Sequence, residues 1–256
     1  MRLTPVNGTS GARGVKDLRD VKGVLFDVDD TLFDYSSSEE AGLLGHLREQ
    51  GLLERFPSPG AALALWRSVM EAEYARYLTG ELTFRRQQYE RTRRFLAHLG
   101  QAGAEHLSDE QAAAWFAGYG VHRDAAWQAF PDARPTLARL APRYRLGVVS
   151  NSDADHQRRK LRTIGLLEYV GEVLVCSDQY GEPKPAPGIF LAGCAGLGLA
   201  PHEVAYVGDK YTLDAEGARD AGLHAFWLDR AASGTPTGEG IHTLHTLDAL
   251  LRALAA

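Results

Sequence analysis

Several short apolar runs, each about as long as a strand and each ending in Asp or Ser, constrain the fold of this chain most. They read GVLFDVD, RLGVVSNSD, EVLVCSD, VAYVGD and HAFWLD. Because they lack polar alternation, they predict strands buried on both faces, as a parallel sheet requires. Helical patterns lie between them, at 132–141, 153–164, 186–197 and 213–221. This alternation predicts a doubly wound α/β fold.

The polar residues that end these runs indicate where a site would lie. They are Asp27, Ser150, Ser177 with Asp178, Asp209 and Asp229. In an open α/β sheet, the ligand crevice lies outside the carboxyl ends of the strands. We therefore expect a site rich in carboxylates at one edge of the sheet.

A long insertion separates the first run from the second. Residues 35–130 far exceed an ordinary crossover and carry apolar residues at helical spacing, with Ser108 placed to cap a helix. They predict a smaller, all-helical domain. The α/β core then comprises 21–34 and 131–256, and the polar, glycine-containing residues 1–20 are expected to form a loose tail.

Composition excludes several classes of protein. Hydrophobic residues make up 45% and charged residues 24%, and no run of about 20 apolar residues could span a membrane. The net charge of −5 provides no overall basic field, so we expect no nucleic-acid partner. Only Cys176 and Cys194 are present, and their apolar flanks indicate buried thiols in a reducing cytoplasm.

The segment VLFDVDDTLFD carries the strongest chemical signal. A buried strand runs directly into Asp27, Asp29 and Asp30, and acids grouped in this way repel one another unless a cation compensates them. Hard oxygen ligands favour Mg²⁺ over zinc. With the metal bound, Asp27 could attack an electrophile while Asp29 moves protons.

Later segments supply groups for the same chemistry. Ser150 and Asn151 offer neutral hydrogen-bond donors to an anion. Lys184 stands between two prolines that restrain its backbone, and it could place a positive charge in the crevice. Asp209 ends a strand and Asp214 follows near a helix start, which provides a distal carboxylate for the metal.

These segments, in this order, resemble the haloacid dehalogenase superfamily, whose first motif DxDxT is matched by Asp27-Val28-Asp29-Asp30-Thr31. A Ser or Thr, a Lys and an acidic pair complete the family pattern, and all are found between Val24 and Ala218. The insertion between the first two motifs is similar to that of members with a helical cap. The resemblance implies a Rossmann-like core, a helical cap and a phosphatase acting on a small phosphorylated metabolite.

The resemblance also implies a role for each matched residue. Asp27 would form an aspartyl phosphate, and Asp29 would protonate the leaving group and then activate water. Mg²⁺ would be held by Asp27, the backbone carbonyl of Asp29 and Asp209. Ser150 and Lys184 would bind the phosphoryl group, with Asn151 beside them and Thr31 in support. Asp214 would orient either Lys184 or a metal-bound water.

Other interpretations stay open at this point. The alternatives are a phosphomutase acting on a phosphosugar, a 2-haloacid dehalogenase of the same fold and a non-catalytic binding protein.

Lys210 stands where relatives commonly have Ser, and it could lie near the metal or point to solvent. The arginines at 85, 86, 91, 93 and 94 are expected to form a solvated helix face. The sequence selects neither one metabolite nor an oligomeric state.

Overall fold

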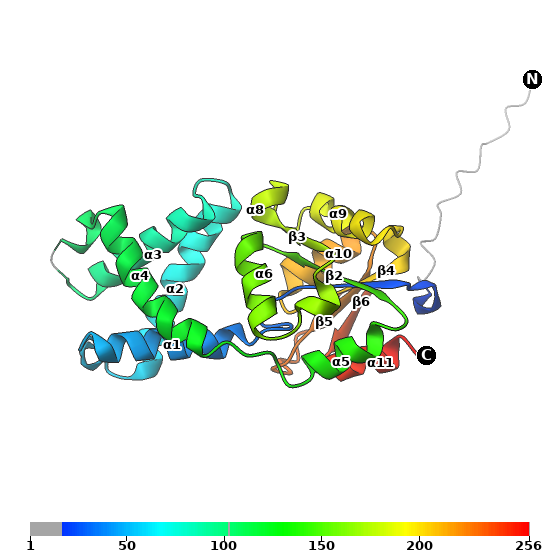
Figure 1. The fold of residues 1–256 in the computed structure, drawn as a ribbon, viewed down its shortest axis with the longest axis horizontal. Helices are drawn as coiled ribbons and strands as arrows, with labels where there is room; N and C mark the ends of the chain where they lie inside the picture. The colour runs from blue at the N-terminus through cyan, green and yellow to red at the C-terminus, as the bar shows by residue number, and fades with distance from the viewer. Residues whose placement is uncertain (1–16, 102, 256) are drawn as a thin grey trace, which may run out of the picture.

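A parallel sheet forms the centre of the α/β core (Figure 1). In this computed structural model, which describes residues 17–101 and 103–255, the sheet has six strands in the order β3-β2-β1-β4-β5-β6. The strands are β1 Gly23–Phe26, β2 Arg145–Ser150, β3 Leu174–Cys176, β4 Val204–Gly208, β5 His224–Leu228 and β6 Ile241–Leu244. Every pairing between these six strands is parallel, which confirms the predicted fold class. The edge strand β6 was not predicted.

The register of the sheet brings the polar strand ends together. Phe26, the last residue of β1, pairs with Val148 of β2 and with Val207 of β4. The residues that follow these three positions therefore emerge at one edge of the sheet. Among them are Asp27 and Ser150, as the sequence predicted.

Helices cover both faces of the sheet. One face carries α5 Ala133–Leu140, α6 Ala154–Thr163 and α11 Leu247–Ala253, and the other carries α9 Pro187–Leu197 and α10 Gly217–Asp220. Short helices α7 Leu167–Val170 and α8 Ser177–Tyr180 flank β3. The helix predicted at 213–221 has a different form, because a π-helical turn over Tyr211–Glu216 precedes α10.

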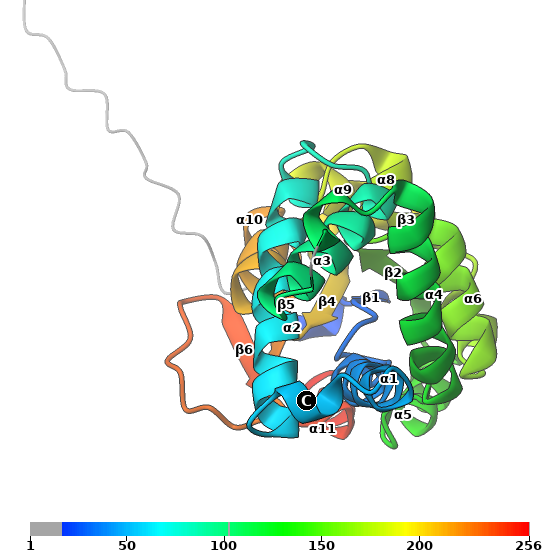
Figure 2. The ribbon, with the colours of Figure 1, turned by 90° about the vertical axis from the view of Figure 1, so that its left-hand side faces the viewer.

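The insertion between β1 and β2 folds into helices α1 Tyr35–Glu49, α2 Pro59–Leu78, α3 Phe84–His98 and α4 Asp109–Ala125. These cap helices have an apolar core of their own around the fully buried Trp66. Ser108 caps α4 and forms a capping box with Gln111, as its sequence position predicted. Figure 2, which views the molecule from this side, shows the cap helices in front of the strands of the sheet.

The prediction that five arginines form a solvated helix face is wrong for two of them. Arg91 and Arg93 are buried, whereas Arg85, Arg86 and Arg94 are exposed. Arg91 pairs with the buried Glu39 and lies over the ring of Trp66. Pairing and aromatic stacking compensate the burial of a guanidinium, and helical periodicity alone does not reveal such partners.

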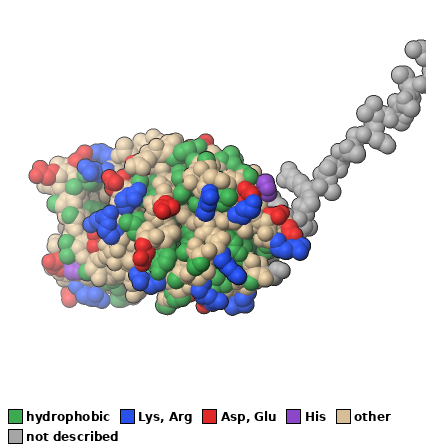
Figure 3. Space-filling view, turned by 45° about the vertical axis from the view of Figure 1, so that its right-hand side comes forward, with side chains coloured by type: hydrophobic (Ala, Val, Ile, Leu, Met, Phe, Trp, Pro, Cys, Tyr) green, Lys and Arg blue, Asp and Glu red, His purple; other side chains and the backbone are tan. Residues whose placement is uncertain are grey.

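Charged side chains of both signs are interspersed over the face of the molecule in Figure 3. None of the described helices is long and apolar enough to cross a membrane.

Cys176 and Cys194 are buried and unpaired, as predicted. Of the predicted tail, residues 1–16 lie outside the described part of the chain, and Leu18–Asp20 forms a short 3₁₀ turn.

Candidate active site

Asp27 lies at the carboxyl end of β1 and is buried. Its backbone N–H donates to the carbonyl of Val207 at 2.9 Å, which extends the pairing of β1 with β4 by one residue. Burial raises the pKa of the Asp27 carboxyl to about 8, although the neighbouring Lys184 opposes the change. Because the pKa stays near 8 even beside Lys184, this carboxylate needs further positive charge if it is to act as an anion at neutral pH.

Lys184 is the cation that already lies against Asp27. Its ammonium Nζ lies 2.7 Å from Asp27 Oδ1 and 2.7 Å from Asp214 Oδ1, and it donates to the hydroxyl of Tyr206 at 2.9 Å. Burial would lower the pKa of Lys184, but Asp214 and Asp27 outweigh burial and raise it well above its usual value. Lys184 is thus a fixed cation beside the predicted nucleophile.

Asp214 is fully engaged by its neighbours. Oδ1 accepts from Lys184 and, at 2.9 Å, from the hydroxyl of Tyr206, while Oδ2 accepts from the backbone N–H of Lys210 at 2.9 Å. Asp214 was expected to orient either Lys184 or a metal-bound water, and in this structure it contacts Lys184 directly.

Asp209, at the end of β4, completes a group of carboxylates. One oxygen from each of Asp27, Asp209 and Asp214 lies within 4.8 Å of the other two. Burial and the neighbouring Asp214 raise the pKa of Asp209 to about 7. Asp209 Oδ1 is buried and has no hydrogen-bond partner among the described residues. Lys210 Nζ lies 3.3 Å from Asp209 Oδ2, but its side chain is mostly exposed.

Asp29 is held by two side chains of α6. Its carboxylate forms an ion pair with Lys160 and accepts from Gln157 Nε2 at 2.8 Å. Burial would raise the pKa of Asp29, but Lys160 and the hydrogen bond from Gln157 outweigh it and lower the pKa below its usual value. This environment favours the ionised form of Asp29.

The remaining residues of the first motif shape the turn that leads into the cap. Asp30 adopts a positive φ of 57°, and its carboxylate accepts from the backbone N–H and hydroxyl of Ser36 at 2.9 and 2.8 Å. Thr31 is fully buried behind this turn, and its hydroxyl has no hydrogen-bond partner in the described part of the chain. The turn thus connects the end of β1 to the start of α1.

Ser150 and Asn151 follow β2 but face different partners. The hydroxyl of Ser150 accepts from Gln157 Nε2 at 3.0 Å and lines the crevice. The amide of Asn151, which was expected to bind an anion, donates to the Lys184 carbonyl at 2.9 Å and accepts from the Lys184 N–H at 2.7 Å. Asn151 therefore anchors the backbone that carries Lys184.

A cavity of about 620 Å³ has cap helices as its wall, and its floor is formed by Asp27, Asp29, Ser150, Lys184, Asp209 and Asp214. The wall includes the buried Glu39, whose two oxygens bind Arg91 and Arg67 at 2.9 Å each. The cap also contacts the core beside the floor, because Tyr74 donates to the Asn151 carbonyl at 2.5 Å and Tyr77 bonds Ser177 at 2.9 Å. Such a cavity suits a small ligand.

Comparison with known proteins agrees with this architecture. The family model for haloacid dehalogenase-like hydrolases matches residues 21–222. The chain belongs to this family. The hydrolase is 32% identical to the phosphoserine phosphatase of Thermus thermophilus, over 82% of this chain and 89% of that protein. It is 32% identical to the glyceraldehyde 3-phosphate phosphatase of Methanopyrus kandleri, over 79% and 82%.

The fold comparison extends over nearly the whole hydrolase. A putative hydrolase of the same superfamily from Bacillus subtilis superposes with a TM-score of 0.76 at 21% identity, over 92% of this chain and 99% of that one. At this identity the likeness concerns the fold alone.

Sequence reasoning missed Lys160, Gln157 and Tyr206 in this hydrolase. The first two lie three residues apart on α6, both buried, on the helical face that also carries Leu161. Polar residues on a buried helix face were the available signal. Tyr206 is the polar residue within the buried strand VAYVG, and a buried tyrosine hydroxyl usually has a partner.

Proposed function

We propose that this hydrolase is a magnesium-dependent phosphatase that removes the phosphoryl group from a small metabolite by way of an aspartyl phosphate on Asp27. The observation that carries the proposal is the contact of 2.7 Å between the buried Asp27 carboxylate and Lys184 Nζ, on the floor of the cavity. Phosphoryl transfer depends mostly on positioning and charge neutralisation, and this pair provides both.

The donor set fits Mg²⁺. Asp27, Asp209 and the backbone carbonyl of Asp29 would hold the ion, and the unpartnered buried oxygen of Asp209 is a ligand in need of a cation. When bound, Mg²⁺ neutralises charge on the phosphoryl oxygens. Asp214 offers an oxygen within 4.8 Å of those of Asp27 and Asp209, but its oxygens already accept three hydrogen bonds, so we assign it to orienting Lys184.

The protein's own groups account for the remaining chemistry. An oxygen of Asp27 attacks phosphorus, while Lys184 neutralises the phosphoryl oxygens and Ser150 donates a hydrogen bond to them. With substrate bound, the protonated form of Asp29 gives its proton to the leaving group, and the ionised Asp29 that results takes one from the water that hydrolyses the acyl phosphate. The ionised state that Lys160 favours is the state that this second step requires.

We assign residues 35–130 to a cap that sets substrate selectivity and excludes bulk water from the floor. The cavity volume of about 620 Å³ and the named phosphatase relatives support a small phosphorylated metabolite. The two buried, unpaired cysteines suit a cytoplasmic enzyme.

A dehalogenase would need no acid two residues after its nucleophile. Asp29 is such an acid, and Lys160 and Gln157 hold it in place at the floor. This arrangement favours phosphoryl transfer over displacement of halide.

The test is hydrolysis of an aryl phosphate with and without Mg²⁺ by the wild type, Asp27→Asn and the matched control Asp178→Asn. Asp178 follows β3 and is exposed, so the control should retain activity. We expect Mg²⁺-dependent turnover that Asp27→Asn abolishes. Wild-type turnover no faster than that of Asp27→Asn would refute the proposal, and transfer of phosphate within a phosphosugar would indicate a mutase.

A further inference from the structure

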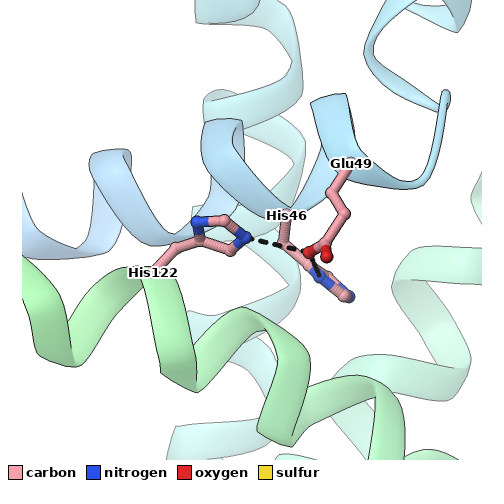
Figure 4. A group of neighbouring side chains, drawn as sticks. All are labelled: His46, Glu49 and His122. Carbon is pink, nitrogen blue, oxygen red and sulfur yellow. Dashed lines mark hydrogen bonds and ion pairs between the residues drawn. The ribbon is translucent and has the colours of Figure 1, made fainter.

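A second group of potential ligands lies within the cap. His46 and Glu49 on α1 and His122 on α4 each place one atom within 4.8 Å of the others, and their side chains converge between the two helices (Figure 4). Glu49 Oε2 lies 3.0 Å from His122 Nε2 and 3.8 Å from His46 Nδ1. These three residues are not among the described residues that line the cavity above Asp27 and Lys184, which is called the acidic site below.

The spacing of these atoms suits a tetrahedral metal. Zinc binds imidazole nitrogen and carboxylate oxygen at about 2.0–2.2 Å, which places neighbouring ligands about 3.3 Å apart. The distances from the Glu49 oxygen, 3.0 and 3.8 Å, lie on either side of that value. Two imidazoles and one carboxylate are also a donor set that transition metals prefer over magnesium.

The packing of α1 against α4 makes room for the two rings. A Cβ at Gly118 of α4 would lie 2.4 Å from Cε1 of His46, and a Cβ at Gly45 of α1 would lie 2.7 Å from Nδ1 of His122. Each ring therefore rests on a glycine of the opposite helix. A larger residue at either glycine would displace an imidazole.

His46 provides an independent reason to expect a ligand. Its side chain is only 4% exposed, and neither ring nitrogen has a hydrogen-bond partner among the described residues. A neutral imidazole carries one donor and one acceptor, and buried polar groups are normally satisfied. A plain helix contact accounts for the hydrogen bond between His122 and Glu49, but it leaves His46 with no hydrogen bond and only the longer contact of 3.8 Å to Glu49.

We propose that His46, Glu49 and His122 bind a divalent transition metal of the zinc class. Glu49 and His122 are 62% and 34% exposed, so water can reach the ion and complete its coordination. The chain enters the cap through α1 and leaves it through α4. The metal therefore joins the two helices that connect the cap to the core and stabilises the cap independently of the acidic site.

The test uses the full chain freed of metal, with Zn²⁺ and Co²⁺ as probes. Asp209→Asn serves as background, because it disables the acidic site and leaves the cap unchanged. We expect it to bind one Zn²⁺ per chain, to melt at higher temperature with Zn²⁺, and to show with Co²⁺ the intense visible absorption of a tetrahedral site.

Adding His122→Ala or Glu49→Gln should weaken Zn²⁺ binding at least about 100-fold and remove the absorption, since even outer partners of metal ligands cost 10–100-fold. Both side chains are partly or largely exposed, so these variants should fold, which circular dichroism verifies. His106→Ala, an exposed cap histidine, is the matched control and should bind as the background does. The proposal is overturned if the background shows no tetrahedral absorption or if His122→Ala binds Zn²⁺ equally tightly.

Discussion

The floor of the cavity and its cap wall both bury charged side chains, but they position them by different means. On the floor, Asp27 and Asp209 follow directly from strands, so the pairing of the sheet places them. On the wall, Glu39 and Arg91 come from α1 and α3, and only the packing of these helices brings them together. Strand pairing thus fixes the position of the floor, whereas the wall depends on helix packing, and we propose that the floor carries the chemistry while the wall sets selectivity.

The largest expected effect concerns the cation of the floor. Lys184→Met removes the partner of two buried carboxylates, and breaking a buried pair in this way costs about 3–5 kcal/mol. The free energy of unfolding, measured in urea without metal, should fall by that amount. The matched control Lys210→Met removes an ammonium that is mostly exposed and should cost less than about 1 kcal/mol. Equal losses would show that the floor does not depend on Lys184.

On the wall, Arg91→Met leaves the buried Glu39 with Arg67 as its remaining cation. We expect a loss of about 2–4 kcal/mol in the same urea experiment, because a buried carboxylate loses a partner. Turnover of a small aryl phosphate should change less than about 10-fold, since the floor is untouched. Arg85→Met, at an exposed site on the same helix, is the control. A loss of turnover without a loss of stability would assign chemistry to the wall.

Magnesium binding should strengthen with pH. In the metal-free protein the pKa values of Asp27 and Asp209 are raised to about 8 and 7, so both carboxyls lose protons between pH 6 and 8. Their raised pKa values stabilise the metal-free fold at low pH, and this contribution is lost as pH rises through them, while the ionised pair becomes available to Mg²⁺.

The apparent affinity for Mg²⁺, measured by thermal unfolding, should therefore be at least about 10-fold tighter at pH 8 than at pH 6. Asp209→Asn should flatten this dependence. An affinity that is independent of pH would contradict the assignment of the ion to the floor.

The smallest effect is expected where cap and core meet. Tyr77→Phe removes the hydrogen bond to Ser177, which contributes about 0.5–1.5 kcal/mol. KM for a small substrate should rise a few-fold while kcat stays within about 2-fold, because only the position of the cap is affected. Tyr89→Phe, elsewhere on the cap, serves as control. A large drop in kcat would place Tyr77 in the chemistry of the floor.

The sequence predicted the floor better than the wall for a physical reason. Parallel strands bring their carboxyl ends to one edge, so Asp27, Ser150 and Asp209 could be placed together without coordinates. Lys160 and Gln157 were missed because their positions depend on how α6 packs on the sheet. Arg91 was taken for a solvated residue because helical periodicity does not show which charges have buried partners.

The positions of the two cap histidines also depend on helix packing, which the sequence pattern does not show. His46 and His122 are far apart in the sequence, and only the close approach of α1 and α4 at Gly45 and Gly118 brings them together. The edge strand β6 escaped prediction because its four residues have exposed side chains at both central positions.

The central claim is that Asp27 carries the phosphoryl group, and chemical trapping tests it most directly. Wild-type enzyme mixed with substrate and Mg²⁺ is quenched in acid and treated with borohydride, which reduces an acyl phosphate to an alcohol. Peptide mass spectrometry should then find homoserine at position 27 in the wild type and aspartate at the same position when substrate is omitted. Turnover with no modification at Asp27, or with the modification at another carboxylate, would contradict the account.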